Sequence, residues 1–393
     1  MGVVGSPLIN EMLENCNVFN ITRGGVELMI GQYLEKLEHL VDLEHVRRSE
    51  ELQRASAAYE PVDRIPLILG SADDMSKIRF PFSDWPIFEY GEVFKDPEKM
   101  LLDELLTVYE GTLIKDDKVY VIRANYGVGI IPSLFGCEII QSGNDLPWVK
   151  PMDSLDDIKK IVKKGVPDVN TGMVSTINET QDFFRSKLRD YPNLRKSVHI
   201  GMVDNQGPFN IAVSMRGPDL FVELYDHKAL IKDFLELITQ TYIEFSRNQK
   251  KRTDEEMNIG YYFQYRLSSG VKISEDHALS ISPQMYDEFC LPFNARIGEE
   301  FGGMSILLCG QTKHIIKDII ETPHLKGIIY WSENFDDLVY AYQLAKDKKI
   351  CLMWYGGIPR NRRKEFPTGI ILKEQVRSID EALRIREEYA RSR

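Results

Sequence analysis

Short apolar runs separated by longer amphipathic stretches recur along the chain after residue 62. Such runs are typical of strands in a parallel sheet, and the amphipathic stretches between them predict helices. Eight strands are predicted, at Ile65–Leu69, Val119–Ala124, Val198–Val203, Ile259–Phe263, Ala278–Ile281, Ser305–Leu308, Gly327–Trp331 and Cys351–Tyr355. The alternation predicts an α/β protein, a closed (β/α)8 TIM barrel, with an open doubly wound sheet as the alternative if one strand is miscounted.

Helix signals fit this alternation. The clearest helix is predicted from Asp226 as its N-cap, because apolar residues follow at three- and four-residue steps up to Phe245. Pro283 marks the start of a helix over 284–301, and Asp336-Asp337 mark another.

The first 60 residues have a different texture. Between about 24 and 58 the chain is rich in charge, with apolar positions at helical spacing and no glycine after Gly31. We therefore expect an N-terminal helical segment over residues 1–60, followed by a barrel domain over 61–393.

The composition of the chain limits the kinds of partner and compartment that we expect. The 60 acidic and 49 basic side chains give a formal charge of −11, which argues against broad nucleic-acid binding. The basic run around Arg360 and Lys364 is interpreted first as a solvated loop and second as an anchor for an anion or an acidic partner. Five scattered cysteines suit a reducing compartment, and no stretch has the features of a secretory signal or a membrane span. We expect a cytoplasmic protein without a membrane partner.

Several motifs of well-known enzyme classes are absent. No G-x-G-x-x-G opens a helix, and no phosphate-binding G-x-x-x-x-G-K-[ST] loop occurs. Neither H-E-x-x-H nor G-x-S-x-G is present, which disfavours the usual zinc proteases and serine hydrolases. The chemistry must therefore come from dispersed residues.

In a barrel, ligands bind where strands pass into the following loops. The candidates at these positions are Asp73, Asp74, Tyr126, Asp204, Gln206, Tyr262, Gln264, Cys309, His314, Glu333 and Trp354. Aromatic residues such as Trp331 and Tyr355 fit a flat apolar pocket, although core packing explains alternate members of each run equally well.

The loop Asp204-Asn205-Gln206-Gly207-Pro208 is the most persuasive site segment. Polar side chains follow a strand directly, and a Gly-Pro pair fixes the turn behind them. We expect Asp204 and Gln206 to contact the substrate; a capping role for Asp204 is the alternative. The segment Glu275-Asp276-His277 fits acid–base groups, and a helix cap or a salt bridge at the bottom of the barrel explains it at least as well.

Several stretches together resemble the uroporphyrinogen decarboxylase superfamily, and most closely its corrinoid-dependent methyltransferases. They occur in the family order, as Pro61-Val62-Asp63-Arg64-Ile65-Pro66, Tyr126-Gly127-Val128-Gly129, Asp204-Asn205-Gln206-Gly207-Pro208-Phe209, Ser274-Glu275-Asp276, Ser282-Pro283-Gln284-Met285-Tyr286 and Leu308-Cys309-Gly310. True decarboxylases of the family carry an arginine-rich stretch after the first strand. Here that place is Leu69-Gly70-Ser71-Ala72-Asp73-Asp74-Met75, so porphyrinogen decarboxylation is disfavoured.

In the methyltransferase branch, a strand that ends in H-x-C supplies two zinc ligands. This chain has Cys309 but carries Leu307 in place of the histidine. Two interpretations of Cys309 remain: it binds zinc together with Cys351, Glu333 or His314, or it is a buried small apolar residue.

The resemblance implies a methyltransferase that moves a methyl group from a small O-methyl donor, such as a methoxylated aromatic compound, to a corrinoid protein. Zinc at Cys309 and Cys351 would activate the leaving oxygen; without zinc, a protonated side chain near Asp204 or Tyr262 would be needed. Catalytic roles are expected for Asp204, Gln206 and Tyr262, and substrate contacts for Asp73, Tyr126, Trp331, Glu333 and Trp354.

Two other functions stay open. One is a decarboxylase or other lyase, for which cations such as Arg64, Arg79 or Arg123 should converge on the barrel mouth. The other is a non-catalytic family member that binds a small molecule, for which a buried Cys309 and an apolar mouth would be expected.

Overall fold

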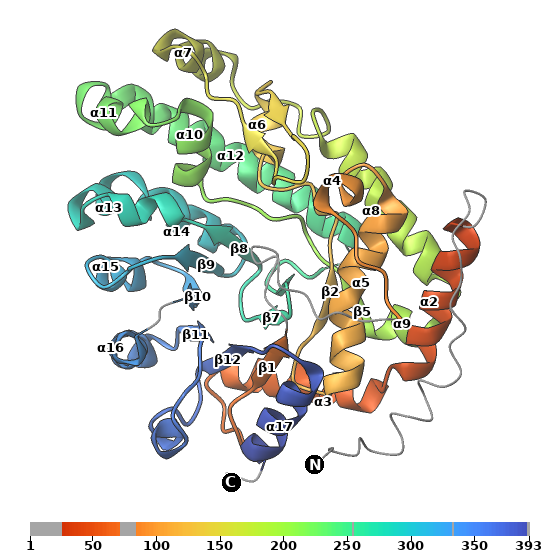
Figure 1. Ribbon diagram of the computed structural model, residues 1–393. Helices are drawn as coiled ribbons and strands as arrows, with labels where there is room; N and C mark the ends of the chain where they lie inside the picture. The colour runs from red at the N-terminus through yellow and green to blue at the C-terminus, as the bar shows by residue number, and fades with distance from the viewer. Residues whose placement is uncertain (1–25, 71–83, 254, 332–333, 391–393) are drawn as a thin grey trace.

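The structure is a computed structural model that describes residues 26–70, 84–253, 255–331 and 334–390. Within these residues, eight parallel strands form the barrel (Figure 1). They are β1 (Leu67–Gly70), β2 (Tyr120–Ile122), β5 (Val198–Ile200), β8 (Val271–Ser274), β9 (Met304–Cys309), β10 (Leu325–Trp331), β11 (Cys351–Tyr355) and β12 (Ile370–Gln375). The (β/α)8 architecture expected from the sequence is confirmed.

Strand pairing shows how the barrel closes. Six strands form one parallel sheet in the order β1-β12-β11-β10-β9-β8, so the last strand of the chain pairs with the first. Strand β2 pairs with β5, and the segment after β5 reaches β8 through a bridge between Gln206 and Ser274. The strands are short and apolar because both faces are covered, one by the barrel interior and the other by helices.

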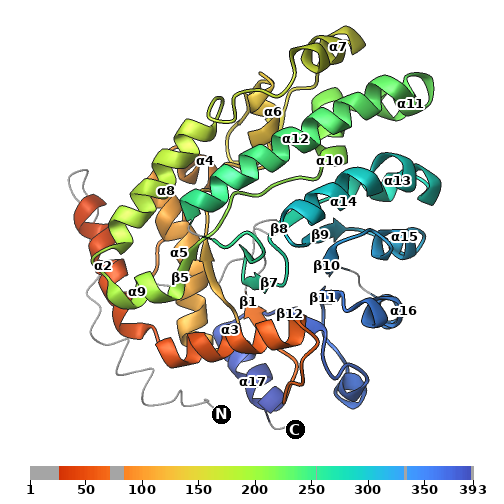
Figure 2. The ribbon, with the colours of Figure 1, turned by 180° about the vertical axis from the view of Figure 1, so that it is seen from behind.

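Helices surround the strands (Figures 1 and 2). They are α2 (Val26–Leu40), α3 (Leu43–Ala57), α4 (Tyr90–Val93), α5 (Pro97–Ile114), α6 (Ile130–Leu134), α7 (Leu155–Lys164), α8 (Val174–Leu188), α9 (Pro192–Ser197), α10 (Pro208–Arg216), α11 (Asp219–Asp226), α12 (Lys228–Thr253), α13 (Pro283–Phe289), α14 (Leu291–Glu300), α15 (Ile316–Ile320), α16 (Phe335–Ala345) and α17 (Ile379–Ala390). None of these described helices is long and apolar enough to cross a membrane.

The predicted number of barrel strands is right, but two of the eight predicted segments are not barrel strands. Ala278–Ile281 lies largely in a short 3-10 helix (Asp276–Ser280). Ile259–Phe263 contains β6 (Gly260–Tyr262), which pairs antiparallel with β7 (Tyr265–Leu267) in a hairpin and is not a barrel strand. The strands missed are β8 and β12. Both carry charged residues that point inward, and these interrupt the apolar pattern on which the prediction rests.

The helix predictions hold with shifted boundaries. Helix α12 begins at Lys228, and Asp226 is the last residue of α11. The predicted helix over 284–301 is two helices, α13 and α14, which meet at Cys290. Pro292 lies in the first turn of α14 and has no N–H group to continue α13. Helix α16 starts where expected, with Asn334 accepting the backbone N–H of Asp336.

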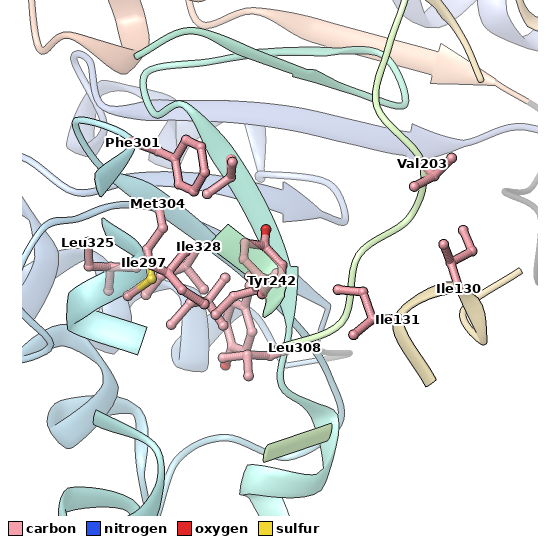
Figure 3. Packing of buried hydrophobic residues seen from close by; sticks show 14 of the residues in the cluster. Ile130, Ile131, Val203, Tyr242, Ile297, Phe301, Met304, Leu308, Leu325 and Ile328 are labelled. Atoms are coloured by element: carbon pink, nitrogen blue, oxygen red, sulfur yellow. The ribbon is translucent and has the colours of Figure 1, made fainter. Parts of the chain in front are cut away.

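The two faces of the strands contribute to different apolar clusters. Leu308 and Ile328 point outward and lie near Ile297 of α14 in the main core (Figure 3). Cys351, Met353 and their neighbours point inward, where Tyr262 and Tyr265 of the β6–β7 hairpin pack against them. The hairpin therefore fills part of the barrel interior.

The N-terminal helices belong to the same core as the barrel. Leu34 and Leu37 of α2 and Val46 of α3 are buried within the main apolar cluster. Gln53 of α3 donates to the backbone oxygens of Asp117 and Gln264 at 2.7 and 2.9 Å. These contacts hold α3 against the segment before β2 and against the hairpin.

Candidate active site

The centre of the candidate site is an ion pair between Asp204 and Lys272. Asp204 lies in the loop after β5, and Lys272 points inward from β8. The Lys272 ammonium group donates to Asp204 Oδ1, and it donates to Ser274 Oγ at 2.6 Å. The Lys272 side chain is 3% exposed and that of Asp204 is 18% exposed, so Asp204 is the more exposed member of a largely buried pair.

Two more groups surround this pair. The Arg123 guanidinium lies 3.4 Å from Asp204 Oδ2, and the Tyr262 hydroxyl donates to the same carboxylate. The ring of Tyr262 lies beneath Lys272, with 4.1 Å between Nζ and the ring centroid. The two cations and the aromatic ring thus fix Asp204 from three strands or loops.

The pKa values follow from this geometry. Burial raises the pKa of Asp204, but Lys272 and Arg123 outweigh it and leave that pKa below its ordinary value. Burial lowers the pKa of Lys272, while Asp204 works in the opposite direction. The result is a charged pair in which the lysine holds its proton less tightly than a lysine in water.

The sequence interpretation identified part of this cluster. The structure brings together Asp204 and Tyr262, as expected of two catalytic residues. Gln206 is next to them in the loop, where its Oε1 accepts the Asn210 amide at 2.9 Å. Lys272 was missed because it lies in β8, the strand absent from the prediction. A lysine within the apolar run Val271-Lys272-Ile273 was the signal that could have revealed it.

Cys309 is at the end of β9, on the inward face, and is exposed. Its backbone N–H donates to Asp276 Oδ1 at 2.6 Å, and its thiol also hydrogen-bonds to that carboxyl group. The alternative in which Cys309 is a buried apolar residue is therefore wrong.

Cys351 does not join Cys309. Strand register places Cys351 level with Gly327 and Cys309 level with Trp331, four residues further along β10. That offset corresponds to about 13 Å along a parallel sheet, whereas two thiolates on one zinc ion lie about 4 Å apart. Cys351 is 1% exposed in an apolar cluster, and burial raises its pKa to about 12. The prediction that these two cysteines form a metal site is wrong.

No complete zinc site is present among the described residues, which do not include Glu333. Among them, no three His, Cys, Asp or Glu side chains lie close enough to hold a metal ion. His314 is exposed. Leu307, in the position of the family histidine, is part of the inward apolar surface beside Tyr355.

The predicted substrate residues have different places. Trp354 is 1% exposed and points outward to Tyr330, with 5.2 Å between the ring centroids, so its expected place at the mouth is wrong. Tyr126 is buried, and its hydroxyl hydrogen-bonds to Thr180 of α8 at 2.8 Å. Asp73, Asp74, Glu333 and the Trp331 side chain lie outside the described residues.

Of the cations named for a lyase, Arg123 and Arg64 lie in the described part of the chain, and Arg123 is the one of these two that reaches the site. Arg123 lies beside Asp204. Arg64 precedes β1 and is paired with Asp117, which precedes β2, and Arg79 is outside the described residues. In the basic loop, Arg362 is paired with Glu365, and Arg363 stacks on the ring of Tyr389.

Comparison with known proteins agrees with this architecture. The family model described as uroporphyrinogen decarboxylase (URO-D) matches residues 49–353. The chain belongs to the uroporphyrinogen decarboxylase family. A solved structure described as a methyltransferase from Methanosarcina mazei is similar over 87% of this chain and 99% of its own, with a TM-score of 0.58 and 14% sequence identity. No curated protein sequence matches. Membership of the uroporphyrinogen decarboxylase family confirms the resemblance found in the sequence, and the solved structure confirms the fold.

Proposed function

We propose that the protein is a methyltransferase that moves a methyl group from a small O-methyl donor, such as a methoxylated aromatic compound, to a corrinoid carried by a partner protein. Its place in the uroporphyrinogen decarboxylase family and its likeness in fold to a methyltransferase support this proposal. The observation that carries it is the Asp204–Lys272 pair, since transfer from an ether needs a group that can protonate the departing oxygen.

Lys272 is suited to be that acid. Two of its three N–H bonds go to Asp204 and Ser274, and no other acceptor takes the third among the residues that the structure describes. That N–H can be given to a substrate oxygen. Because burial lowers the pKa of Lys272, its proton is easier to transfer than that of a solvated lysine.

In the proposed reaction the methyl group would be taken by the reduced corrinoid of the partner, which would supply the electron pair for the new bond to the methyl carbon. The electrons of the broken C–O bond go to the oxygen, which takes the proton of Lys272. Asp204 stabilises the ammonium form of Lys272 before transfer and favours its recovery from water afterwards. Arg123 offsets the charge of Asp204 when Lys272 is neutral.

Zinc has no step in this proposal. The described donors around Cys309 do not fit a zinc ion, and Lys272 near Asp204 and Tyr262 supplies the acid that would otherwise be required. The exposed Cys309 thiol is then a residue at the rim of the site, hydrogen-bonded to Asp276.

A decarboxylase is the second candidate, and Arg123 is the observation in its favour. A guanidinium beside Asp204 can hold a substrate carboxylate. The non-catalytic alternative receives less support, because Cys309 is exposed and the site contains buried charges in place of an apolar mouth. The scattered free thiols suit the reducing cytoplasm that we propose as the site of action.

One assay separates these candidates. The purified protein is incubated with free reduced corrinoid and, one at a time, methoxylated benzoates, methoxyphenols and aliphatic methyl ethers. Methyl transfer is followed by the absorbance of the corrinoid, and CO2 release is measured in parallel. Methylation that Lys272→Met abolishes supports the proposal. CO2 release without methylation would favour the decarboxylase. If neither methylated corrinoid nor CO2 forms, the non-catalytic binding protein would be favoured.

A further inference from the structure

Glu275 is a buried carboxyl group directly behind the site, and it has no part in the proposed reaction. It follows Ser274 at the end of β8 and is 0% exposed. Its Oε2 accepts the backbone N–H of Asn210 at 3.3 Å, and the Phe209 N–H also faces the carboxyl group. These N–H groups belong to the first turn of α10, which directly follows the loop that contains Asp204 and Gln206.

The loop and β8 are joined at several further points. Ser274 N–H donates to the Asn205 carbonyl at 3.3 Å, and Gly207 N–H donates to the Ser274 carbonyl at 2.8 Å. The side chain of Asn210 adds two contacts, since it donates to Gln206 Oε1 and accepts the His277 N–H, both at 2.9 Å. Residues 204–210 are thus tied to residues 274–277 by backbone and side chain alike.

Gly207 shows how closely the carboxyl group approaches. A Cβ atom at this position would lie 2.0 Å from Glu275 Oε1 and 2.3 Å from Cδ. The backbone of Gly207 has φ −72° and ψ 163°, an extended conformation that any residue adopts. Glycine is therefore required here by the proximity of Glu275 and not by backbone conformation.

The carboxyl group is suited to a neutral state. Its Oε1 has no hydrogen-bond partner within the described part of the chain. Burial raises the pKa of Glu275 to about 8, although the surrounding N–H groups and Asn294 lower it. An unpaired buried carboxylate would be costly, so the neutral acid is the form that this pocket accommodates.

We propose that Glu275 is a positioning residue of the active site: its buried carboxyl group anchors the first turn of α10 and so holds Asp204 and Gln206 against β8. The residue touches neither substrate nor reacting atoms. Removing it lets the 204–210 loop move, and displacement of a catalytic group by about 1 Å can reduce a rate on the order of 100-fold.

The test uses four variants of the full chain: Glu275→Gln, Glu275→Ala, Gly207→Ala and the double variant Gly207→Ala/Glu275→Ala. Gly298→Ala is the matched control, because its new Cβ would crowd His324 at 2.7 Å, away from this loop. The readouts are kcat and KM for methyl transfer, and hydrogen exchange of the amides in residues 205–216. The activity readout rests on the proposed function, whereas hydrogen exchange does not.

Glu275→Gln keeps the neutral shape and is expected to retain kcat within about threefold, whereas Glu275→Ala and Gly207→Ala each lower it by about tenfold or more and speed exchange in the loop. In the double variant the new methyl group occupies the space vacated by the carboxyl group, so its loss is smaller than the product of the two single losses. Gly298→Ala leaves loop exchange unchanged. Independent effects of the two substitutions, or slow exchange in folded Glu275→Ala, would overturn the inference. If Glu275→Ala does not fold, the comparison of Gly207→Ala with Glu275→Gln decides it, because a normal kcat in Gly207→Ala overturns the inference.

Discussion

The Lys272 ammonium group lies between the carboxylate of Asp204 and the ring of Tyr262, deep inside the barrel. The three residues come from β8, from the loop after β5 and from the β6–β7 hairpin, so their contact depends on the complete fold. A lysine that is almost fully buried needs such partners to remain charged. This relationship is the basis of the proposed chemistry.

Loss of one member of the pair should destabilise the protein more than loss of both. Lys272→Met leaves the Asp204 charge with Arg123 alone and is expected to lower the free energy of unfolding by ~3 kcal/mol. In Lys272→Met/Asp204→Asn the uncompensated charge is gone, so part of that loss should return. Urea denaturation of wild type, Lys272→Met, Asp204→Asn and the double variant measures the coupling. A loss in the double variant that equals or exceeds the sum of the two single losses would show that the pair is not coupled in this way.

The stability of the protein should carry a pH dependence from Glu275. A glutamate in the unfolded chain loses its proton near pH 4.5, whereas Glu275 in the folded protein holds it to about pH 8. Between these values the folded state binds more protons than the unfolded state. The contribution of Glu275 to the free energy of unfolding is therefore complete at low pH and is lost as pH rises through 8, and the free energy of unfolding changes by at most ~1.4 kcal/mol per pH unit.

Glu275→Gln removes this slope, and the difference between the two proteins isolates it from other groups. Asp276, Cys290 and Tyr286 face the carboxyl group or lie close to it, and they stay in both proteins. The measurement is the free energy of unfolding of each protein at pH 5, 6, 7 and 8. If the free energies of unfolding of the two proteins change in parallel from pH 5 to 8, Glu275 is ionised in the folded protein over that whole range.

Zinc content should not depend on Cys351. The residue faces an apolar cluster and is about 13 Å along the sheet from Cys309, too far to share one ion. After loading with zinc and dialysis, wild type and Cys351→Ser should hold the same amount of metal per chain by elemental analysis. We also expect methyl transfer to survive a chelator. A loss of about one zinc per chain in Cys351→Ser would contradict the strand register.

Leu307→His should create a metal site that the natural sequence does not form. Residues 307 and 309 lie on the same face of β9, and the Asp276 carboxyl group contacts Cys309. Histidine, cysteine and aspartate would then provide three donors, as in open zinc sites. Titration with zinc should show tighter binding by this variant than by wild type, and Leu307→Asn provides a control for polarity. Equal affinities in all three proteins would show that these donors do not converge.

The sequence predicted the fold well and the site only in part. Apolar runs such as Met304–Cys309 and Cys351–Tyr355 identify strands because both of their faces are buried. The pattern failed at β8 and β12, where Lys272 and Lys373 point into the barrel. In a sequence pattern, a buried lysine looks like an exposed polar residue. Its burial depends on partners that are close only in the folded structure.

Site residues were predictable where position along a strand decides the matter. Asp204 lies in the loop after β5, as expected, and Tyr262 meets it although its strand is part of a hairpin. The prediction for Trp354 was wrong because the face of β11 on which it lies is set by pairing with neighbouring strands. The prediction for Cys351 was wrong because that pairing also sets the register of β11. The contact of Glu275 with α10 was not predicted, because acid–base groups, a helix cap and a salt bridge all fitted its segment and the contact spans 65 residues of sequence.

In the proposed reaction, Lys272 gives its proton to the departing oxygen of a methyl ether. The direct test is a series of aryl methyl ethers whose phenols differ in acidity, with kcat/KM for methyl transfer measured for wild type and Lys272→Met. Poor leaving groups need the proton most, so the ratio of wild type to variant should rise as the phenol becomes a weaker acid and approach one for nitrophenols. A ratio that stays constant across the series would contradict proton donation by Lys272 and leave it a structural partner of Asp204.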